Sequence, residues 1–366
     1  MAEPLVIEAT GTHREVGRQI GEAGRELVAW GLDAYASRFE GLAGFGFTEA
    51  VERAHGYLKR AEDYVPQTVD QLRGMAEGAN VRFDHLVALN CSEEFTCQAD
   101  RCWPPEHCTS FGLVVDERPV AGHNEDWYPE EIEAQTVRVV HITGRWSEAA
   151  YISVGPAYDL PISGLTAAGF SSSGNTVYYR DERVGVPNNF LVATVLCQPD
   201  LEHVKQLLTA APRARGSNHL LCDKRGRVWD IETSGERWAM IEGSPPPAEA
   251  ATYGATALLA HTNHYVSPEL VPGDASRSEG SRLRRERAEL LLLEGLRAGR
   301  DPVEIGRRLL SDHANEQFSI CSHWQDDDPD PGQSVTTASM IWEPAEGRVH
   351  VALGQPCETE YRVFQL

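Results

Sequence analysis

The sequence predicts an α+β fold in which antiparallel sheets are covered by helices. The segment before residue 108 repeats apolar residues at helical spacing, whereas the segment after it has the patterning of strands. These strands come in pairs joined by short polar turns, and helical stretches separate one group of strands from the next. Because strands grouped in hairpins favour antiparallel pairing over βαβ units, we expect two stacked antiparallel sheets between helical layers.

Helices dominate the first third of the chain. Apolar residues at helical spacing mark them, and we expect helices at residues 12–39, 48–65, 68–80 and 83–95. The loop that follows contains Pro104 and Pro105, which prevent helix there and leave the backbone extended and exposed.

Strands dominate the rest of the chain, with four helices among them. We expect hairpins at residues 109–127, 136–155, 162–179 and 218–233, and further strands at 256–265, 334–344, 347–354 and 361–366. The expected helices are at residues 188–197, 200–211, 281–299 and 301–312. The last of these has Asp301 as its N-cap and Pro302 at its first position, a pairing typical of helix starts.

Composition narrows the classes of partner. The 366 residues carry a formal net charge of -22, which repels nucleic acid and acidic lipid surfaces, so we expect neither as a partner. No apolar run reaches the roughly 20 residues that a membrane span needs, and the N-terminus lacks a secretory signal, so we expect a cytoplasmic protein. Eight cysteines in a chain of this length, without a signal, do not indicate a disulfide framework.

The first expected hairpin carries a candidate nucleophile, Cys108. If its turn is centred on Glu117, pairing runs outward from Val115 and Pro119 and places Cys108 opposite Asp126. Residues directly opposite one another lie on one face, with Cβ atoms about 5 Å apart. We therefore expect Asp126 to hold the group at Cys108 by a hydrogen bond or by charge.

A second polar motif, HTNHY at residues 261–265, ends an expected strand. The side-chain N–H of Asn263 at a sheet edge could stabilise a developing oxyanion, a task in which one lost donor costs about 10²–10³ in rate. By spacing alone, a turn cap at the strand end is the more common role for an asparagine in this position.

Several motifs together resemble one enzyme family. The motifs are Thr-Ser after Cys108, then GHNEDW, GLTAAGFSSSGN, HTNHY, DHANEQFSICSHW, SVTTASMIW and ALGQPCETEY, in that order along nearly the whole chain. They resemble acyl-CoA:6-aminopenicillanate acyltransferase (isopenicillin N acyltransferase) and its relatives, a family that includes β-alanyl-dopamine hydrolase and belongs to the N-terminal nucleophile hydrolases.

The resemblance implies a four-layer αββα sandwich that is made as a precursor and cut between His107 and Cys108. Residues 1–107 would form a helical pro-segment or small subunit, and residues 108–366 the αββα catalytic subunit, together in one compact unit. No cofactor and no metal are implied. The partners implied are a small-molecule amide substrate, an acyl-CoA or amine acceptor, and the two fragments of the precursor themselves.

The resemblance also assigns roles to residues. Cys108 matches the nucleophile of self-cleavage and turnover, Asn263 the oxyanion-hole asparagine, and Asp126 the acidic residue near the nucleophile. Bile salt hydrolases have a comparable asparagine near Asn175. The supporting candidates are Thr109, His107 and His264, and His107 stands where the family usually has glycine.

The implied chemistry agrees with the residues. A cysteine at a new N-terminus has its own α-amine, with a pKa of about 7.7–8.0, which can accept the thiol proton. Attack on an amide then gives a thioester on Cys108, which water or an amine resolves. We therefore expect hydrolysis or acyl transfer on a small linear N-acyl amine or N-acyl amino acid.

Other functions remain open at this point. A papain-type thiol hydrolase would use Cys108 with His264, in the right chain order but without the local papain signature. A non-catalytic relative could bind a metal or another ligand. His313, Cys321 and His323 form one cluster, and Cys97, Cys102, His107 and Cys108 another, but neither has regular zinc-site spacing, so we expect no metal. The arginine-rich run 282–287 is interpreted as a solvated helix face.

Overall fold

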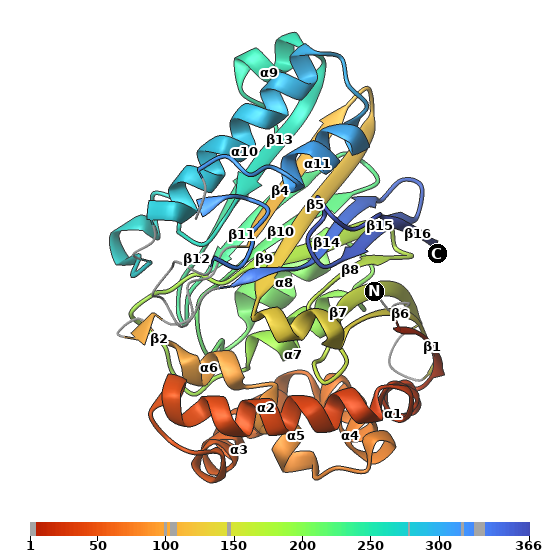
Figure 1. Ribbon diagram of the computed structural model, residues 1–366, viewed down its shortest axis with the longest axis vertical. Coiled ribbons are helices and arrows are strands. Elements are labelled where there is room, and N and C mark those ends of the chain that lie inside the picture. Colours follow the sequence, from red (N-terminus) through yellow and green to blue (C-terminus); the bar gives the residue numbers. More distant parts are fainter. Residues whose placement is uncertain are drawn as a thin grey trace.

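Two β-sheets lie face to face between two layers of helices in the computed structural model, which describes residues 5–98, 101–102, 108–144, 148–276, 279–315, 318–325 and 334–366 (Figure 1). The larger sheet has eight strands in the order β1-β6-β7-β8-β9-β10-β11-β12. Its strands are β1 (Leu5–Gly11), β6 (Gln135–Ile142), β7 (Ala149–Pro156), β8 (Ser163–Thr166), β9 (Phe170–Asn175), β10 (Ser217–Asp223), β11 (Val228–Thr233) and β12 (Trp238–Glu242).

The second sheet has six strands in the order β13-β4-β5-β14-β15-β16. Its strands are β13 (Ala255–His261), β4 (Thr109–Val115), β5 (Arg118–Trp127), β14 (Val335–Glu343), β15 (Arg348–Leu353) and β16 (Arg362–Gln365). Two short strands that precede β4 in the sequence, β2 (Cys97–Gln98) and β3 (Arg101–Cys102), form a separate two-stranded sheet.

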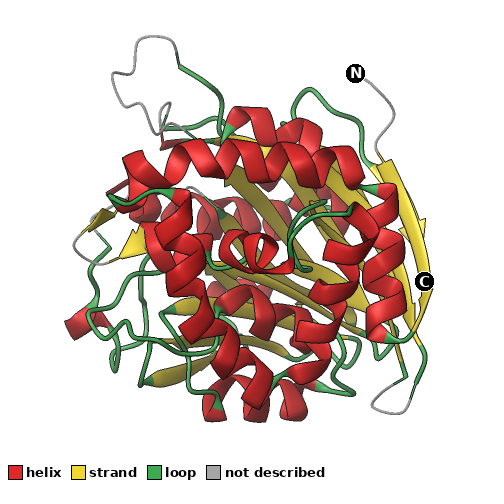
Figure 2. Ribbon diagram, turned by 90° about the horizontal axis from the view of Figure 1, so that it is seen from below, coloured by secondary structure: helices red, strands yellow, loops and turns green. Residues whose placement is uncertain are grey.

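Helices cover the outer face of each sheet. Those on the eight-stranded sheet are α1 (His13–Ala23), α2 (Arg25–Ala43), α3 (Phe47–Tyr64), α4 (Pro66–Ala79), α5 (Phe83–Leu89), α6 (Ser92–Thr96), α7 (Asn188–Val195) and α8 (Leu201–Ala210). Those on the six-stranded sheet are α9 (Ala248–Thr252), α10 (Glu279–Arg297) and α11 (Pro302–Leu310). Figure 2 shows one layer of helices lying across the strands.

An apolar core lies between each pair of neighbouring layers. One joins the N-terminal helices to the outer face of the eight-stranded sheet, where Tyr151 and Phe170 are buried. Another joins α10 and α11 to the six-stranded sheet through Phe111 and Ile341. The third lies between the sheets and includes Trp342. The predicted αββα sandwich with an N-terminal helical segment is therefore confirmed.

The helix predictions hold where caps and prolines mark the ends. α4 begins at Pro66, and α11 begins at Pro302 with the Asp301 side chain accepting a hydrogen bond from the Val303 N–H. The helix expected over 12–39 is divided at Gly24 into α1 and α2. The sequence prediction did not include the short elements β12 and α9.

The chain start was predicted incompletely. Residues 5–11 form β1, which pairs in parallel with β6 from Leu5 beside Thr136 to Gly11 beside Ile142. The eight-stranded sheet is thus antiparallel except at this edge. The prediction missed β1 because its partner lies far along the chain, although the burial of LVIEATG alternates as in a strand. Among the described residues, no helix is both long enough and apolar enough to cross a bilayer.

The hairpin β4–β5 is shifted by one residue from the predicted register. Asp116 and Glu117 both have positive φ, 50° and 61°, so they form a two-residue turn. Turns of this kind match the twist of paired strands. Val115 therefore pairs with Arg118, and Thr109 pairs with Asn124. Continued by one residue, this register sets Cys108 opposite Glu125, not opposite Asp126.

Candidate active site

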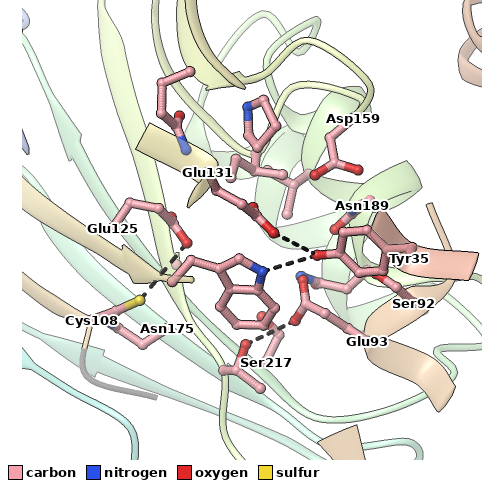
Figure 3. A pocket seen from close by; sticks show the side chains of 18 residues that line it. Tyr35, Ser92, Glu93, Cys108, Glu125, Glu131, Asp159, Asn175, Asn189 and Ser217 are labelled. Carbon is pink, nitrogen blue, oxygen red and sulfur yellow. Dashed lines mark hydrogen bonds between the residues drawn. The ribbon is translucent and has the colours of Figure 1, made fainter. Parts of the chain in front are cut away.

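Cys108 directly precedes β4 and is 6% exposed. It lies between the ends of β13 and β5, the two strands that flank β4 in the sheet. Beside it is a polar cavity of about 60 Å³. The residues that line it with Cys108 include Tyr35, Ser92, Glu93, Glu125, Glu131, Asp159, Asn175, Asn189 and Ser217 (Figure 3). A buried thiol thus lies at the wall of a polar cavity.

The Cys108 thiol meets one carboxylate and one backbone segment. Its Sγ lies 3.9 Å from Oε1 of Glu125, and the two side chains point toward one another in Figure 3. The backbone N–H of Asp126 donates to Sγ at 3.4 Å, and the backbone oxygen of Asp126 accepts at 3.8 Å. A backbone N–H that donates to sulfur stabilises the thiolate form.

Glu125 belongs to a hydrogen-bonded chain that the sequence analysis missed. Nε2 of His123 lies 3.1 Å from Oε2 of Glu125, and Nδ1 of His123 lies 2.9 Å from the Ser110 hydroxyl. With Nε2–H donating to Glu125, Nδ1 accepts from Ser110. Because side chains alternate along a strand, the correct register of β4–β5 would have placed both His123 and Glu125 on the Cys108 side.

The side chain of Asp126 lies on the other side of β5. It is fully buried and near Thr336 and the guanidinium of Arg284. Burial raises the pKa of Asp126 to about 7, against the opposing effects of Thr336 and Arg284. The contacts of Asp126 with Cys108 come from its backbone, so its predicted role stays a prediction that now rests on the family resemblance.

Asn263 lies two residues beyond the end of β13. His261 pairs with Ser110, so the same register continued by two residues sets Asn263 beside Cys108. Its Nδ2 donates at 3.1 Å to the backbone oxygen of Thr176, a residue that also lines the cavity. Its Oδ1 accepts from Nη2 of Arg284 at 3.0 Å.

Arg284 corrects one sequence interpretation. The run 282–287 was interpreted as a solvated face, yet Arg284 is fully buried and contacts Asn263. A guanidinium can only donate, so it accepts no bond from an amide nitrogen. Arg284 therefore fixes the Asn263 amide with its oxygen toward α10 and its nitrogen toward Thr176. Charge in a sequence run does not reveal which member of the run turns inward.

Asn175 lies at the end of β9 and lines the cavity. It is 1% exposed, and neither side-chain polar atom has a hydrogen-bond partner among the described residues. An unpaired buried amide costs free energy, about 1–3 kcal/mol for one group. A substrate or intermediate that used these groups would recover that cost. Thr109, also buried, follows Cys108 in the chain, and its hydroxyl likewise finds no partner in the described part of the structure.

Of the two supporting histidines, His264 lies in the described part of the structure and His107 does not. Nδ1 of His264 lies 2.7 Å from the Ser281 hydroxyl, and burial, then the neighbouring His261, lowers the pKa of His264 to about 3. An imidazole with so low a pKa is a weak base at neutral pH. His107, and with it the N-terminal side of the predicted cleavage point, lies outside the described residues.

The N-terminal segment contributes directly to the site. Trp127 Nε1 donates to the Tyr35 hydroxyl at 2.9 Å, and that hydroxyl donates to Glu131 at 3.2 Å (Figure 3). The Thr176 hydroxyl donates to Glu93 at 2.9 Å. The cavity beside Cys108 is therefore built jointly by residues before and after position 108.

Residues 115–358 match the family described as acyl-coenzyme A:6-aminopenicillanic acid acyl-transferase. The chain belongs to this family. The matched span includes Asp126, Asn175 and Asn263 and begins after Cys108. Membership makes this acyl-transferase family protein an enzyme of amide C–N bond chemistry, as the sequence motifs predicted.

Three solved structures resemble the acyl-transferase family protein at low identity. An N-acylethanolamine-hydrolyzing acid amidase ortholog of Caenorhabditis elegans is 15% identical over 65% of this chain and 93% of its own, with a TM-score of 0.44. A C2A mutant of conjugated bile acid hydrolase from Clostridium perfringens is 12% identical over 71% of this chain and 97% of its own, with a TM-score of 0.47. Penicillin V acylase from Agrobacterium tumefaciens is 14% identical over 67% of this chain and 83% of its own, with a TM-score of 0.42. The roles of residues in this chain are therefore argued from its own geometry.

Glu125→Gln should lower turnover roughly 10–100-fold, because a hydrogen bond to a charged group contributes about 1.5–3 kcal/mol. The amide keeps the shape of the side chain and removes the charge beside Cys108 and His123. The measurement is kcat and KM on one amide substrate. Glu117→Gln, in the exposed turn at the other end of the same hairpin, is the matched control and should match wild type. Equal rates for both variants would exclude a role for the Glu125 charge.

Proposed function

We propose that this protein is a self-cleaving cysteine amide hydrolase or acyltransferase that acts on a small linear N-acyl amine or N-acyl amino acid through a thioester on Cys108. The observation that carries this proposal is the position of the Cys108 thiol, at the start of β4 and at the wall of a polar cavity. Cleavage before Cys108 would turn that position into an N-terminus, with an α-amine adjacent to the thiol.

The reaction uses that amine as the base. With a pKa of about 7.7–8.0, the free α-amine of Cys108 accepts the thiol proton near neutral pH. The thiolate attacks the amide carbon, the carbonyl oxygen becomes an oxyanion, and the α-ammonium returns the proton to the leaving amine as the C–N bond breaks. The thioester that remains is then attacked by water, which gives the acid, or by an acceptor amine, which gives a new amide.

Two asparagines are the proposed oxyanion donors. Asn263 has a nitrogen oriented away from Arg284, and the Asn175 side chain lines the cavity without a hydrogen-bond partner among the described residues. The Asp126 backbone N–H supports the thiolate from the other side. Donors held in place before the reaction need no reorganisation when charge develops, which is why such groups contribute strongly to rate.

Maturation accounts for the size of the cavity. About 60 Å³ holds only a few water molecules, whereas ligand pockets are typically about 300–1,000 Å³. The cavity is therefore smaller than the pockets that usually hold small-molecule substrates. We infer that cleavage between His107 and Cys108 both frees the α-amine and enlarges the space beside it.

The two fragments should stay together after cleavage. β1 remains paired with β6 across seven residue positions, and Arg38 of α2 holds Glu131 at 2.7 Å. Arg215 pairs with Glu93 at the cavity wall. The amphipathic N-terminal helices also need the eight-stranded sheet to cover their apolar faces. Residues 1–107 therefore act as a subunit of the mature enzyme.

Charge at the site favours one class of amine. Two of the lining carboxylates have arginine partners, Glu93 with Arg215 and Glu131 with Arg38. Glu125, in contrast, contacts His123 and Cys108, and no lysine or arginine pairs with it within the described part of the chain. An anionic group near the nucleophile would be repelled by Glu125, so neutral or cationic amine portions should be preferred over amino acids.

A matched substrate series tests this proposal. One acyl group is attached to a diamine, to an amino alcohol and to an amino acid, and kcat/KM is measured for each. We expect the diamine and amino-alcohol amides to be cleaved at least tenfold faster than the amino-acid amide, a difference of about 1.4 kcal/mol. Cleavage of folded proteins without cleavage of any of these amides would contradict the proposal.

A thiol hydrolase that works without cleavage is the second candidate. Its supporting observation is His123, whose ring nitrogen lies within 4.8 Å of the Cys108 sulfur. The imidazole first considered, that of His264, contacts Ser281 and Thr262 and is a weak base. An intact chain with full activity, measured by mass spectrometry of the assayed sample, would favour this candidate over self-cleavage.

A further inference from the structure

Four potential metal ligands converge on the six-stranded side of the molecule, and none of the four lines the cavity beside Cys108. His313, Cys321 and His323 come from the segment between α11 and β14, and Cys357 comes from the turn between β15 and β16. His313 and Cys357 are exposed, His323 is half-buried, and Cys321 is buried. Each residue offers one ligand atom, and the four atoms lie within 4.8 Å of one another.

The distances among these atoms lie within about half an ångström of those in a tetrahedral metal site. Nε2 of His323 lies 3.2 Å from Nε2 of His313, 3.5 Å from Sγ of Cys321 and 3.1 Å from Sγ of Cys357. The two sulfurs are 3.7 Å apart. With zinc bonds of about 2.3 Å to sulfur and about 2.0–2.1 Å to nitrogen, a tetrahedron separates its ligands by about 3.3–3.8 Å. A disulfide, by contrast, needs about 2.05 Å between sulfurs.

We propose that His313, Cys321, His323 and Cys357 bind one Zn²⁺ in a closed structural site. Two thiolates and two imidazoles are the ligand set of many such sites, and four protein ligands leave no open position for substrate. Binding converts two thiols to thiolates and releases two protons, so the neutral Cys₂His₂ group gains a dication and loses two protons with no net change of charge. Soft sulfur ligands in tetrahedral geometry favour zinc over magnesium or calcium.

The sequence analysis expected no metal here because the spacing of His313, Cys321 and His323 is irregular. The fourth ligand was missing from that cluster. Antiparallel pairing of β14 with β15, in the register of Ala338 with Leu353, carries the chain back to this corner and delivers Cys357. Ligands that come from two loops do not follow the spacing of a single zinc-binding loop.

The bound ion would join this loop to the sheet that carries the nucleophile. The Asn124 side chain donates to the Ile320 backbone oxygen at 3.0 Å. Ser322 and Thr336 exchange backbone and side-chain hydrogen bonds, and Thr336 pairs with Asp126 on β5. Zinc therefore fixes the loop that packs behind the strand facing Cys108, and it stabilises the fold without taking part in the reaction.

The test is metal content measured on the full-length protein. Wild type purified without chelator from zinc-supplemented medium should contain about one zinc per chain by inductively coupled plasma mass spectrometry. Cys357→Ser and His313→Gln should each reduce zinc content at least fivefold after dialysis. Both positions are exposed, so these variants should fold. Cys197→Ser and His203→Gln, which alter a cysteine and a histidine outside the cluster, are the matched controls and should keep their zinc.

Two further readouts make the result decisive. Cobalt exchanged into wild type should give the visible absorption of a tetrahedral thiolate site, and this absorption should be absent from Cys357→Ser. A chelator should lower the Tm of wild type and leave that of Cys357→Ser unchanged. Three results would each overturn the proposal. Wild type could contain no zinc after incubation with excess zinc, or wild type and both variants could contain equal zinc. The third is a mass about 2 Da below the expected value, which would show a disulfide between Cys321 and Cys357. None of these readouts depends on catalysis, so the proposal stands or falls separately from the proposed function.

Discussion

Cys108→Ala should leave the chain in one piece and abolish amide hydrolysis. The proposed cleavage and the proposed turnover use the same sulfur, which lies 3.4 Å from the Asp126 N–H and 3.9 Å from Glu125. Alanine has no group that can attack a carbonyl, so neither step retains a nucleophile. Wild type should appear as two fragments by intact mass, and the larger should begin Cys-Thr-Ser-Phe by N-terminal sequencing.

Two comparisons show whether the effect belongs to Cys108. Cys197→Ala changes a half-buried cysteine that follows α7 and does not line the cavity beside Cys108, so this variant should process and turn over as wild type does. Cys108→Ser keeps a weaker nucleophile and should retain slow processing. A Cys108→Ala protein that is still cut before residue 108 would show that another protease is responsible. A Cys108→Ala protein that still hydrolyses its amide would place the nucleophile elsewhere.

Local patterns were sufficient to predict most of the fold. Helical periodicity together with Pro66 and the Asp301–Pro302 start located α4 and α11, because these effects act within one turn of the chain. The hairpins followed from short turns between apolar runs. β1 did not, because its pairing with β6 joins residues more than a hundred positions apart, and no local pattern identifies a distant partner.

The register of the hairpin beside the candidate site was predicted to within one residue. Cys108 directly precedes β4 and Asn263 follows the neighbouring strand β13, so the two residues that the family motifs selected lie close together. The error came from the turn, because Asp116 and Glu117 include no glycine, the residue that usually indicates a two-residue turn with positive φ. A shift of one residue exchanges the two faces of a strand, so the prediction chose Asp126 where the Glu125 side chain faces the thiol.

The other differences between the sequence predictions and the structure arise from a buried charge and from contacts between distant parts of the chain. Arg284 belongs to a charged run, yet it turns inward because Asn263 and the carboxylate of Asp126 lie behind α10. Whether one arginine of several is buried depends on what packs against its helix, which the run itself does not encode. Cys357 joins the histidine cluster for a similar reason, since the β14–β15 hairpin determines where it lies.

Asn263→Ala should lower kcat by about 10²–10³ and change KM little. An oxyanion donor acts mainly on the transition state, where the carbonyl oxygen acquires charge, and the loss of one such donor typically costs about 2.7–4 kcal/mol. The Asn263 nitrogen carries two hydrogens, and one of them donates to the Thr176 carbonyl. Steady-state kinetics on one amide substrate gives both constants, and thermal unfolding verifies that the variant is folded.

Two further variants separate electrostatic stabilisation from packing at this position. Asn263→Asp keeps the size of the side chain and replaces the donor with an acceptor, so it should be at least as slow as Asn263→Ala. Arg284→Met leaves Asn263 in place but removes the bond that orients its amide, so it should reduce kcat by a smaller factor. A KM that rises while kcat holds in Asn263→Ala would mean that Asn263 binds the ground state. Unchanged values of both constants would remove Asn263 from the site, and Asn175, whose side chain finds no partner among the described residues, would be the next oxyanion donor to test.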